Sequence, residues 1–429
     1  MGTEINLTVG GISLSFSKNH MGIDFGHLFQ EGDRTRRKMG QINYKYYEDN
    51  PEHIADLEVS EMVFARRLDR IVSRLELLNH SLDAARAEYE TVVAETLEMA
   101  SYSDPPETPS LLSFEEFCAL ACRYPLDVLK DAYIEYETPD RDEVAKGRFA
   151  ADADEFARIP GDRYNDLYYS EKSYLSASLC ILKPESMLRV FALNPANADN
   201  EVVWEFGPLV NNGWANLDDF QPGVRRVQKI LVVTEGASDA RIIKRALEVL
   251  RPDVADFFNF IDEGERHHFW GTGNLVKFGE GLLRIDIQNR VLFVLDNDAE
   301  GVDAYRKLTA LNLPANMRSM LLPDLDAFRS FPARGPEGVS LADINGRAAA
   351  IECYLDLDLP APRPAQVLWS NYKKDVDSWH GALEFKESYQ RHFDDQDDYA
   401  LRNGPYQSTK LGKLLETLIV EACLVLPTT

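Results

Sequence analysis

The chain has 429 residues, of which 45% are hydrophobic and 27% are charged, which provides enough apolar residues for two or three globular domains. This composition excludes an intrinsically disordered chain, and no apolar run is long enough to predict a transmembrane helix. The formal net charge of -25 argues against a broad, passive nucleic-acid-binding surface, but it is compatible with an enzyme that meets phosphates through bound metal and a local basic patch.

The first half of the chain predicts a short β-region followed by helices. Alternating apolar and polar residues over 4–16 predict a hairpin, and the basic stretch 34–38 is expected to form a loop. Residues 58–100 repeat apolar side chains three and four positions apart, which is typical of helix. Ser113 begins the capping-box pattern of another helix, and residues 137–225 are expected to hold several short helices.

The second half alternates predicted strands and helices from residue 229 onward. Its short, continuous, β-branched runs are typical of strands that are buried on both faces. The predicted elements are strands 230–234, 257–261, 290–295 and 317–322, with helices 239–250, 274–285 and 299–311 between them. This alternation predicts a right-handed, mostly parallel α/β sheet.

The region after the sheet is less regular. Residues 331–340, which contain Pro and Gly, predict a loop, and residues 343–355 predict a helix. We therefore expect a multidomain protein of α+β and α/β class. Its expected parts are a mainly helical N-terminal region with a possible β-hairpin start (1–226), an α/β domain (227–360) and a helical C-terminal extension (361–429).

Three acids follow two of the predicted strands: Glu235 comes after the first, and Asp296 and Asp298 come after the third. In parallel sheets, ligands bind at the carboxyl ends of the strands. Three carboxylates on neighbouring strand ends would repel one another unless a cation lay between them. Mg²⁺ and Mn²⁺ prefer such oxygen ligands, so the pattern predicts a divalent-metal site.

The order of motifs in this region resembles the Toprim domain, the metal-binding fold shared by topoisomerases, bacterial primases and OLD-family nucleases. The resemblance covers residues 228–355 and implies metal ligands at the acids of its motifs. The matching segments are Thr234-Glu235-Gly236, Ser238-Asp239, Gly271-Thr272-Gly273-Asn274 and Asp296-Asn297-Asp298-Ala299-Glu300-Gly301. Asp239 opens a predicted helix, and Asp298 and Glu300 precede another, so a capping role stays open for Asp239 and for one of the other two.

Residues further along resemble the OLD-like Toprim nucleases in particular. A Glu in the context Ile351-Glu352-Cys353-Tyr354-Leu355 completes a second metal site in those enzymes, which implies Glu352 as a ligand here. The same resemblance places Lys386 at the position of a catalytic lysine, with Lys410 as the competing candidate. Arg347 either meets phosphate or pairs with an acid. The implied catalytic set is Glu235, Asp296, Asp298 and Lys386, acting with two Mg²⁺ or Mn²⁺ ions about 4 Å apart.

The helical segment 66–78 resembles the N-terminal region of HEPN/Toprim fusion proteins, which are associated with bacterial conflict systems. HEPN ribonucleases carry an Arg followed four to six residues later by a His, and Arg74 and His80 meet that spacing. Two features depart from the pattern. Leu75 is apolar where those enzymes carry a polar residue, and six helical positions place the pair about 120° apart around the axis.

The remaining candidate ligands are cysteines and histidines. The five cysteines, Cys118, Cys122, Cys180, Cys353 and Cys423, are scattered, and we interpret them as reduced, buried thiols of a cytoplasmic protein. Cys118 and Cys122 lack a second ligand pair, which argues against a zinc site there. His267 and His268 follow the second predicted strand, where they touch substrate, bind a softer metal or do neither.

We expect a metal-dependent nuclease that acts on nucleic acid, with DNA favoured over RNA, in antiviral or mobile-element defence. The expected protein is a cytoplasmic homo-oligomer without a membrane anchor, and a partner defence protein is compatible with it. The chain lacks room for the other domains of a topoisomerase, and it lacks the zinc-binding cysteines of a primase. Two alternatives stay open: an HEPN-type ribonuclease with a regulatory Toprim half, and a non-catalytic Toprim sensor or scaffold subunit.

Overall fold

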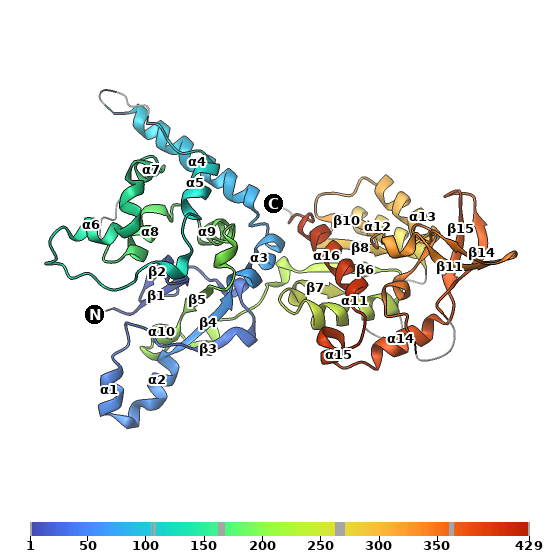
Figure 1. Cartoon of the computed structure of the whole chain (residues 1–429), viewed down its shortest axis with the longest axis horizontal. Helices are drawn as coiled ribbons and strands as arrows, with labels where there is room; N and C mark the ends of the chain where they lie inside the picture. The colour runs from blue at the N-terminus through green and yellow to red at the C-terminus, as the bar shows by residue number, and fades with distance from the viewer. Residues whose placement is uncertain are drawn as a thin grey trace. The chain divides into compact units, whose positions relative to one another are not determined.

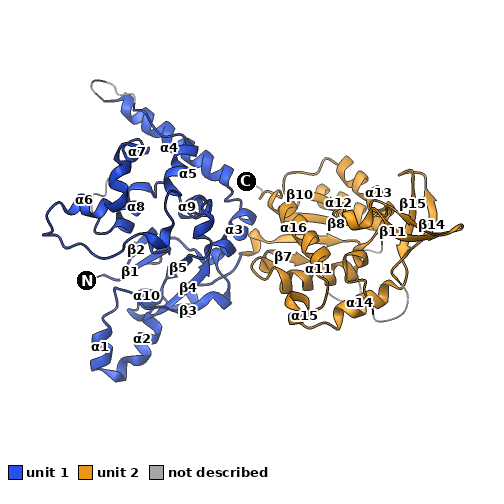
Figure 2. Ribbon diagram, viewed as in Figure 1, with its two compact units in different colours: residues 1–224 blue, residues 225–429 orange. Residues whose placement is uncertain are grey.

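The computed structural model describes residues 2–103, 105, 109–161, 168–261, 271–359 and 364–427. The chain divides into two compact units, residues 1–224 and residues 225–429 (Figure 2). The sequence predicted a domain boundary after residue 226.

Unit 1 is organised on a five-stranded antiparallel sheet with the order β2-β1-β5-β4-β3. Its strands are β1 (Glu4–Val9), β2 (Ile12–Lys18), β3 (Arg34–Arg36), β4 (Met62–Arg67) and β5 (Glu201–Glu205). The predicted hairpin is confirmed, since β1 pairs with β2 and the turn between them uses Gly10 and Gly11, both at positive φ. Two glycines adopt such conformations in succession without strain, because they have no Cβ.

Helices surround this sheet (Figure 1). They are α1 (Tyr44–Asp49), α2 (Ile54–Ser60), α3 (Leu68–Leu77), α4 (Leu82–Ser101), α5 (Phe114–Ala121), α6 (Arg141–Lys146), α7 (Ala153–Ala157), α8 (Glu171–Leu179), α9 (Pro184–Phe191) and α10 (Gly207–Asn211). The core is aromatic: Trp204 of β5 contacts the rings of Phe25, Phe29 and Phe64, and all four side chains are buried. Burial of these large rings supplies much of the hydrophobic stabilisation of the unit.

Three sequence expectations for unit 1 need correction. Residues 34–38 were expected to form a loop but contain β3, and residues 58–100 were expected to be helical but contain β4. Both Val63 and Phe64 of β4 are buried, so this strand has no polar face that would reveal a period of two. Strand β5 lies within the region expected to hold only short helices. The capping box at Ser113 is confirmed at the start of α5.

Unit 2 contains the predicted parallel sheet, with the strand order β10-β8-β6-β7. Its strands are β6 (Ile230–Thr234), β7 (Phe258–Phe260), β8 (Arg290–Leu295) and β10 (Met317–Leu321). Every residue of the central strand β8 is buried. Because side chains alternate across a sheet, Val291 and Phe293 enter the core shared with α12 and α13, and the buried Leu292 and Val294 face the opposite layer.

The helices of unit 2 cover both faces of this sheet (Figure 1). They are α11 (Ala237–Leu250), α12 (Thr272–Arg284), α13 (Ala299–Ala310), α14 (Lys386–Asp394), α15 (Asp398–Asn403) and α16 (Thr409–Cys423). Helices α12 and α13 pack together on one face, and α11 packs with α15 and α16. Within the described ranges, every helix is too short or too polar to cross a lipid bilayer.

The remaining strands of unit 2 correct the expectations for its C-terminal part. A second sheet has the order β12-β11-β14-β15, and a short pair joins β9 to β13. These strands are β9 (Asn297–Asp298), β11 (Phe331–Gly335), β12 (Gly338–Ala342), β13 (Ala348–Ala349), β14 (Val367–Lys373) and β15 (Ser378–Leu383). The loop predicted at 331–340 is therefore a hairpin, and the helical extension begins with the β14–β15 hairpin.

The helix predicted over 343–355 is also wrong. Gly346 has a φ of 69°, which ends any helix there, and a 3-10 helix spans only Ile351–Tyr354. All four of its residues are buried, so the segment has no solvent-facing side and cannot be an ordinary amphipathic helix. This buried segment passes directly beside the strand ends of the main sheet.

Candidate active site

The ends of β6 and β8 bring the first two predicted acids together. Glu235 follows β6 and Asp296 follows β8, and these two strands are parallel neighbours. The backbone N–H of Asp296 donates a hydrogen bond of 3.0 Å to Oε1 of Glu235. The order of strands in the sheet thus places two residues that are 61 positions apart in the sequence at one edge.

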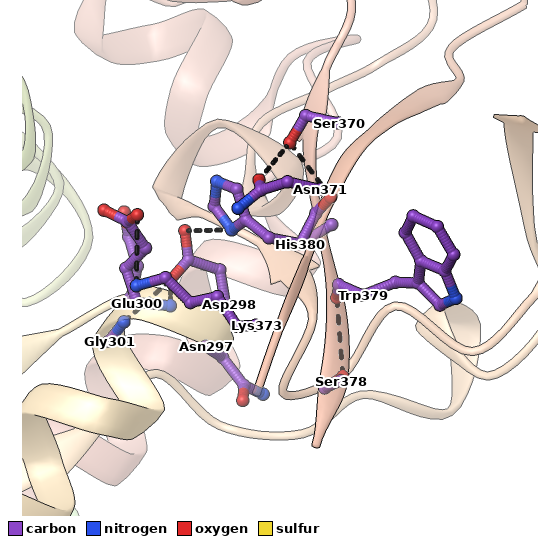
Figure 3. A network of polar contacts seen from close by, with 12 residues as sticks. Asn297, Asp298, Glu300, Gly301, Ser370, Asn371, Lys373, Ser378, Trp379 and His380 are labelled. Atoms are coloured by element: carbon purple, nitrogen blue, oxygen red, sulfur yellow. Dashed lines mark hydrogen bonds and ion pairs between the residues drawn. The ribbon is translucent and has the colours of Figure 1, made fainter. Parts of the chain in front are cut away.

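Asp298 lies beside them and also caps α13. Its Oδ1 accepts hydrogen bonds of 2.8 Å from the backbone N–H groups of Glu300 and Gly301. A side chain at Gly301 would begin 2.0 Å from the carbonyl oxygen of Asp296, so only glycine allows the helix to start this close to the strand end. Asp298 is therefore a helix cap, which was one of the roles that the sequence left open. Its other oxygen, Oδ2, is directed toward the β14–β15 hairpin (Figure 3).

Asp239 belongs to the first turn of α11 and is 9% exposed. Its Oδ2 accepts a hydrogen bond of 3.0 Å from the N–H of Gly236, and its Oδ1 accepts one of 3.1 Å from Ser238. Asp239 is thus a cap as well, but it also repels the carboxylates of Glu235 and Asp296. Capping and membership of the acid group are compatible, because a carboxylate has more than two lone pairs.

Glu352 completes the group from the buried 3-10 helix and is 3% exposed. Its Oε1 accepts a hydrogen bond of 2.7 Å from Gln390 of α14. The preceding residue, Ile351, donates its N–H to Oδ1 of Asp296 at 2.9 Å. We use the name acid cluster for Glu235, Asp239, Asp296, Asp298 and Glu352.

Burial and mutual repulsion raise the pKa of most of these carboxyls. Burial, with the charges of Asp298 and Asp239, raises the pKa of Glu235 to about 8. Burial and Glu352 raise the pKa of Asp239 to about 7. Burial is also the main reason why the pKa values of Asp296 and Asp298 lie above the ordinary range. Carboxylate oxygens are the ligands that a hard divalent cation prefers, and such an ion would offset both the repulsion among these groups and the cost of burying their charge.

Two residues that the sequence analysis did not identify face this cluster from the β14–β15 hairpin (Figure 3). Nδ1 of His380 lies 3.9 Å from Oδ2 of Asp298, is shielded from solvent and has no hydrogen-bond partner among the residues that the structure describes. Lys373 forms an ion pair of 3.1 Å with Glu300, which is 45% exposed. Glu300 therefore lies at the rim rather than inside the cluster. No signal in the sequence could identify either residue, since the hairpin itself was not predicted.

The two candidate lysines differ in their surroundings. Nζ of Lys386, at the start of α14, lies 4.0 Å from Oε1 of Glu352, and its side chain is 51% exposed. Lys410 instead donates a hydrogen bond of 2.6 Å to the carbonyl of Cys353, and burial lowers its pKa to about 8. Lys386 is thus the lysine that meets both the acid cluster and solvent. Arg347 is exposed, and its backbone carbonyl accepts from Gly381 of the hairpin.

The candidates in unit 1 behave differently from the HEPN expectation. Arg74 is fully buried and donates to the backbone carbonyls of His27 and Phe29, so its guanidinium serves the fold. His80 lies beside the ring of His27. His267 and His268 lie outside the described residues.

The five cysteines are free thiols, and one expectation about them needs correction. Cys353 is fully buried, whereas the other four are only partly buried in the structure. Burial raises the pKa of Cys118 to about 12 and that of Cys122 to about 11, so both stay protonated at neutral pH. Protonated thiols are poor metal ligands and poor nucleophiles.

Comparisons with known proteins agree with the N-terminal resemblance. Residues 1–228 match the family model described as HEPN/Toprim N-terminal domain 1. Searches of curated proteins and of solved structures give no match. The family model spans more than half of the 429 residues. The chain therefore belongs to the HEPN/Toprim family.

Proposed function

We propose that this protein is a divalent-metal-dependent nuclease that hydrolyses phosphodiester bonds at the acid cluster of unit 2. The observation that carries the proposal is the convergence of five buried or half-buried carboxyls at the strand ends, four of them with raised pKa values. Such a group destabilises the metal-free fold, so its presence is best explained by a ligand that neutralises it.

The residues that would hold Mg²⁺ or Mn²⁺ are the five carboxyls of the acid cluster. Asp298 and Asp239 raise the pKa of Glu235, and Glu352 raises that of Asp239. All four of the other carboxyls raise the pKa of Asp296, so we propose Asp296 as the central ligand of the site. When bound, the two ions supply Lewis-acid stabilisation of the phosphate and a water of lowered pKa.

The protein's own groups supply positive charge beside these acids. Lys386, close to Glu352 and accessible to solvent, is positioned to stabilise negative charge on a phosphate held at the cluster. Lys373 and Arg347 lie at the rim, where they can contact the nucleic-acid backbone. His380 faces Asp298 and can orient it or accept a proton.

The two alternative readings receive less support. An HEPN-type ribonuclease needs Arg74 at a substrate surface, but this side chain is 0% exposed and donates to backbone carbonyls. A non-catalytic scaffold has no use for clustered acids that cost stability. The resemblance to OLD-like nucleases supports a role against foreign nucleic acid, with DNA as the favoured substrate.

The test is cleavage by the purified full-length protein. Supercoiled plasmid, linear duplex DNA, single-stranded DNA and RNA are incubated with Mg²⁺, with Mn²⁺ or with EDTA. We expect cleavage that needs the metal, that disappears in Asp296→Asn and Glu235→Gln, and that persists in Asp326→Asn, whose carboxylate is 96% exposed in the same unit. Cleavage that persists in EDTA, or equally in Asp296→Asn, would contradict the proposal.

A further inference from the structure

Three side chains from distant parts of unit 1 place possible metal-binding atoms within 4.8 Å of one another: His27, His80 and Glu185. Nε2 of His27 lies 3.4 Å from Oε1 of Glu185, and the rings of His27 and His80 are stacked with centroids 6.5 Å apart. We propose that these residues form a binding site for a divalent transition-metal ion of the Zn²⁺ class. We call them the histidine site; it is separate from the acid cluster of unit 2.

The distances fit this chemistry. In a tetrahedral zinc site with Zn–N and Zn–O bonds of about 2.0–2.1 Å, neighbouring ligand atoms lie about 3.4 Å apart. His27 and Glu185 already have that separation, and the other donor atoms need only small side-chain rotations to reach it. Imidazole and carboxylate together suit Zn²⁺, whereas Mg²⁺ prefers oxygen alone. Three protein ligands leave one position open, which is typical of catalytic rather than structural zinc.

Backbone contacts hold two of the three ligands in place. Arg74 of α3 donates hydrogen bonds of 3.2 and 2.9 Å to the carbonyl of His27, which fixes the 3-10 helix Gly26–Leu28 on α3. His80 follows the end of the same helix, where its N–H donates to the carbonyl of Leu75 at 2.8 Å. Arg74 therefore acts on the site through the backbone of His27, whereas His80 supplies a ligand atom itself.

The third ligand comes from α9. Glu185 occupies the first turn of this helix and is 8% exposed. Arg189 of the same helix forms an ion pair of 2.6 Å with Glu76 of α3, so α3 and α9 are joined next to the site. Glu88 accepts hydrogen bonds from the N–H of Lys183 and the hydroxyl of Ser186, which fixes the start of α9. The site is thus built on packed elements rather than on free loops.

One donor atom of the site, Nε2 of His27, is shielded from solvent and makes no hydrogen bond of ordinary geometry within the described part of the chain. Its contact of 3.4 Å with Oε1 of Glu185 is longer than an ordinary hydrogen bond, so a cation bound between the two atoms would satisfy both. The neutral imidazole is the form that binds metal, and a ring nitrogen of His80 lies within 4.8 Å of the donor atoms of His27 and Glu185.

The experiment measures zinc bound to the full-length protein. Metal-free protein is titrated with Zn²⁺ in excess Mg²⁺, which satisfies the oxygen-rich acid cluster, and Co²⁺ is used in parallel as a spectroscopic probe of tetrahedral coordination. We expect about one Zn²⁺ per chain and visible Co²⁺ absorption bands. His27→Ala and His80→Ala are each expected to weaken Zn²⁺ binding at least about 100-fold, because even residues behind the ligands cost 10–100-fold.

Three further variants make the result decisive. His53→Ala removes a histidine of the same unit whose side chain is 43% exposed, and it is expected to leave zinc binding unchanged. Glu185→Gln removes the carboxylate ligand but keeps the shape of the side chain. Its loss of zinc binding tests the site even if a histidine variant fails to fold. Asp296→Asn, in unit 2, is expected to bind zinc as the wild type does, which separates this site from the proposed nuclease centre. Zinc binding that survives in His27→Ala, His80→Ala and Glu185→Gln, or is absent from the wild type, would overturn the proposal.

Discussion

The N–H of Asp296 donates a hydrogen bond of 3.0 Å to Oε1 of Glu235, so the end of β8 is tied directly to the acid that follows β6. This bond fixes one oxygen of Glu235 and holds two acids together that would otherwise repel each other. The free energy of unfolding of unit 2 is therefore expected to depend on the charge of its candidate active site.

Replacing the central acid is expected to abolish activity without harming the metal-free fold. Asp296→Asn keeps an oxygen that can accept from the N–H of Ile351 but removes a carboxyl whose ionisation burial and the neighbouring acids oppose. Because it removes a candidate metal ligand, we expect nuclease activity to fall at least about 100-fold. Relief of repulsion is expected to stabilise the metal-free unit by about 1 kcal/mol, which raises its Tm by about 2–4 °C. Calorimetry in EDTA and a cleavage assay in Mg²⁺ measure the two effects; a lower Tm in EDTA would contradict this account.

The metal-free protein is expected to lose stability as the pH rises. The pKa of Glu235 rises from its ordinary value of 4.5 to about 8 on folding, and that of Asp239 rises from 3.8 to about 7. The folded state therefore holds more protons, and this stabilising contribution is complete below the ordinary pKa of 3.8 and is lost as the pH rises from there to about 8. Chemical denaturation in EDTA at several pH values measures the slope.

Added Mg²⁺ is expected to reverse this dependence, because the ion displaces the same protons and binds more tightly as the pH rises. The double variant Glu235→Gln/Asp239→Asn serves as the control, since it lacks both titrating groups. We expect a flatter pH profile for it than for the wild type in EDTA. Equal slopes for the two proteins would show that other groups cause the dependence.

Lys386 is expected to affect turnover rather than metal binding. Its ammonium lies 4.0 Å from Glu352 and is half exposed, so it can reach a bound phosphate at little cost to the fold. We expect Lys386→Ala to lower kcat by about 10²–10³-fold and to leave the affinity for Mn²⁺ and the Tm nearly unchanged. Lys413→Ala, at an exposed position of α16, is the matched control. Lys410→Ala is expected instead to lower the Tm, because the carbonyl of Cys353 loses its donor.

Arg74 is expected to be a stability residue of unit 1. Arg74→Ala leaves the carbonyls of His27 and Phe29 without this donor, at a cost of about 1–3 kcal/mol for each buried group. Thermal unfolding, compared with that of Arg70→Ala at an exposed position of the same helix, measures the loss. Nuclease activity per folded molecule is expected to remain. A variant that folds as the wild type does but no longer cleaves RNA would instead support HEPN chemistry.

Local sequence patterns were sufficient to predict the parallel sheet of unit 2. Strand β8 is a continuous apolar run that is buried on both faces, and the polar residues that follow it mark the strand end. Glu235, Asp296 and Asp298 could be named as neighbours because parallel strands bring their carboxyl ends to one edge. The hairpin of β1 and β2 was equally local, since two adjacent glycines set its turn.

The other strands, the residues that face the acid cluster and the histidine site could be found only from the tertiary structure, because they depend on contacts between distant segments. Strand β4 pairs with β3 and β5, and β5 pairs also with β1, so the partners of both strands lie well away from them in the sequence. Their short apolar runs could therefore equally belong to helices. His380 reaches Asp298 only because an unpredicted hairpin folds over the strand ends. The histidine site joins positions 27, 80 and 185, and no spacing rule connects them. Sequence periodicity reports the face that an element buries, but the partner that covers this face is chosen by packing of the whole chain.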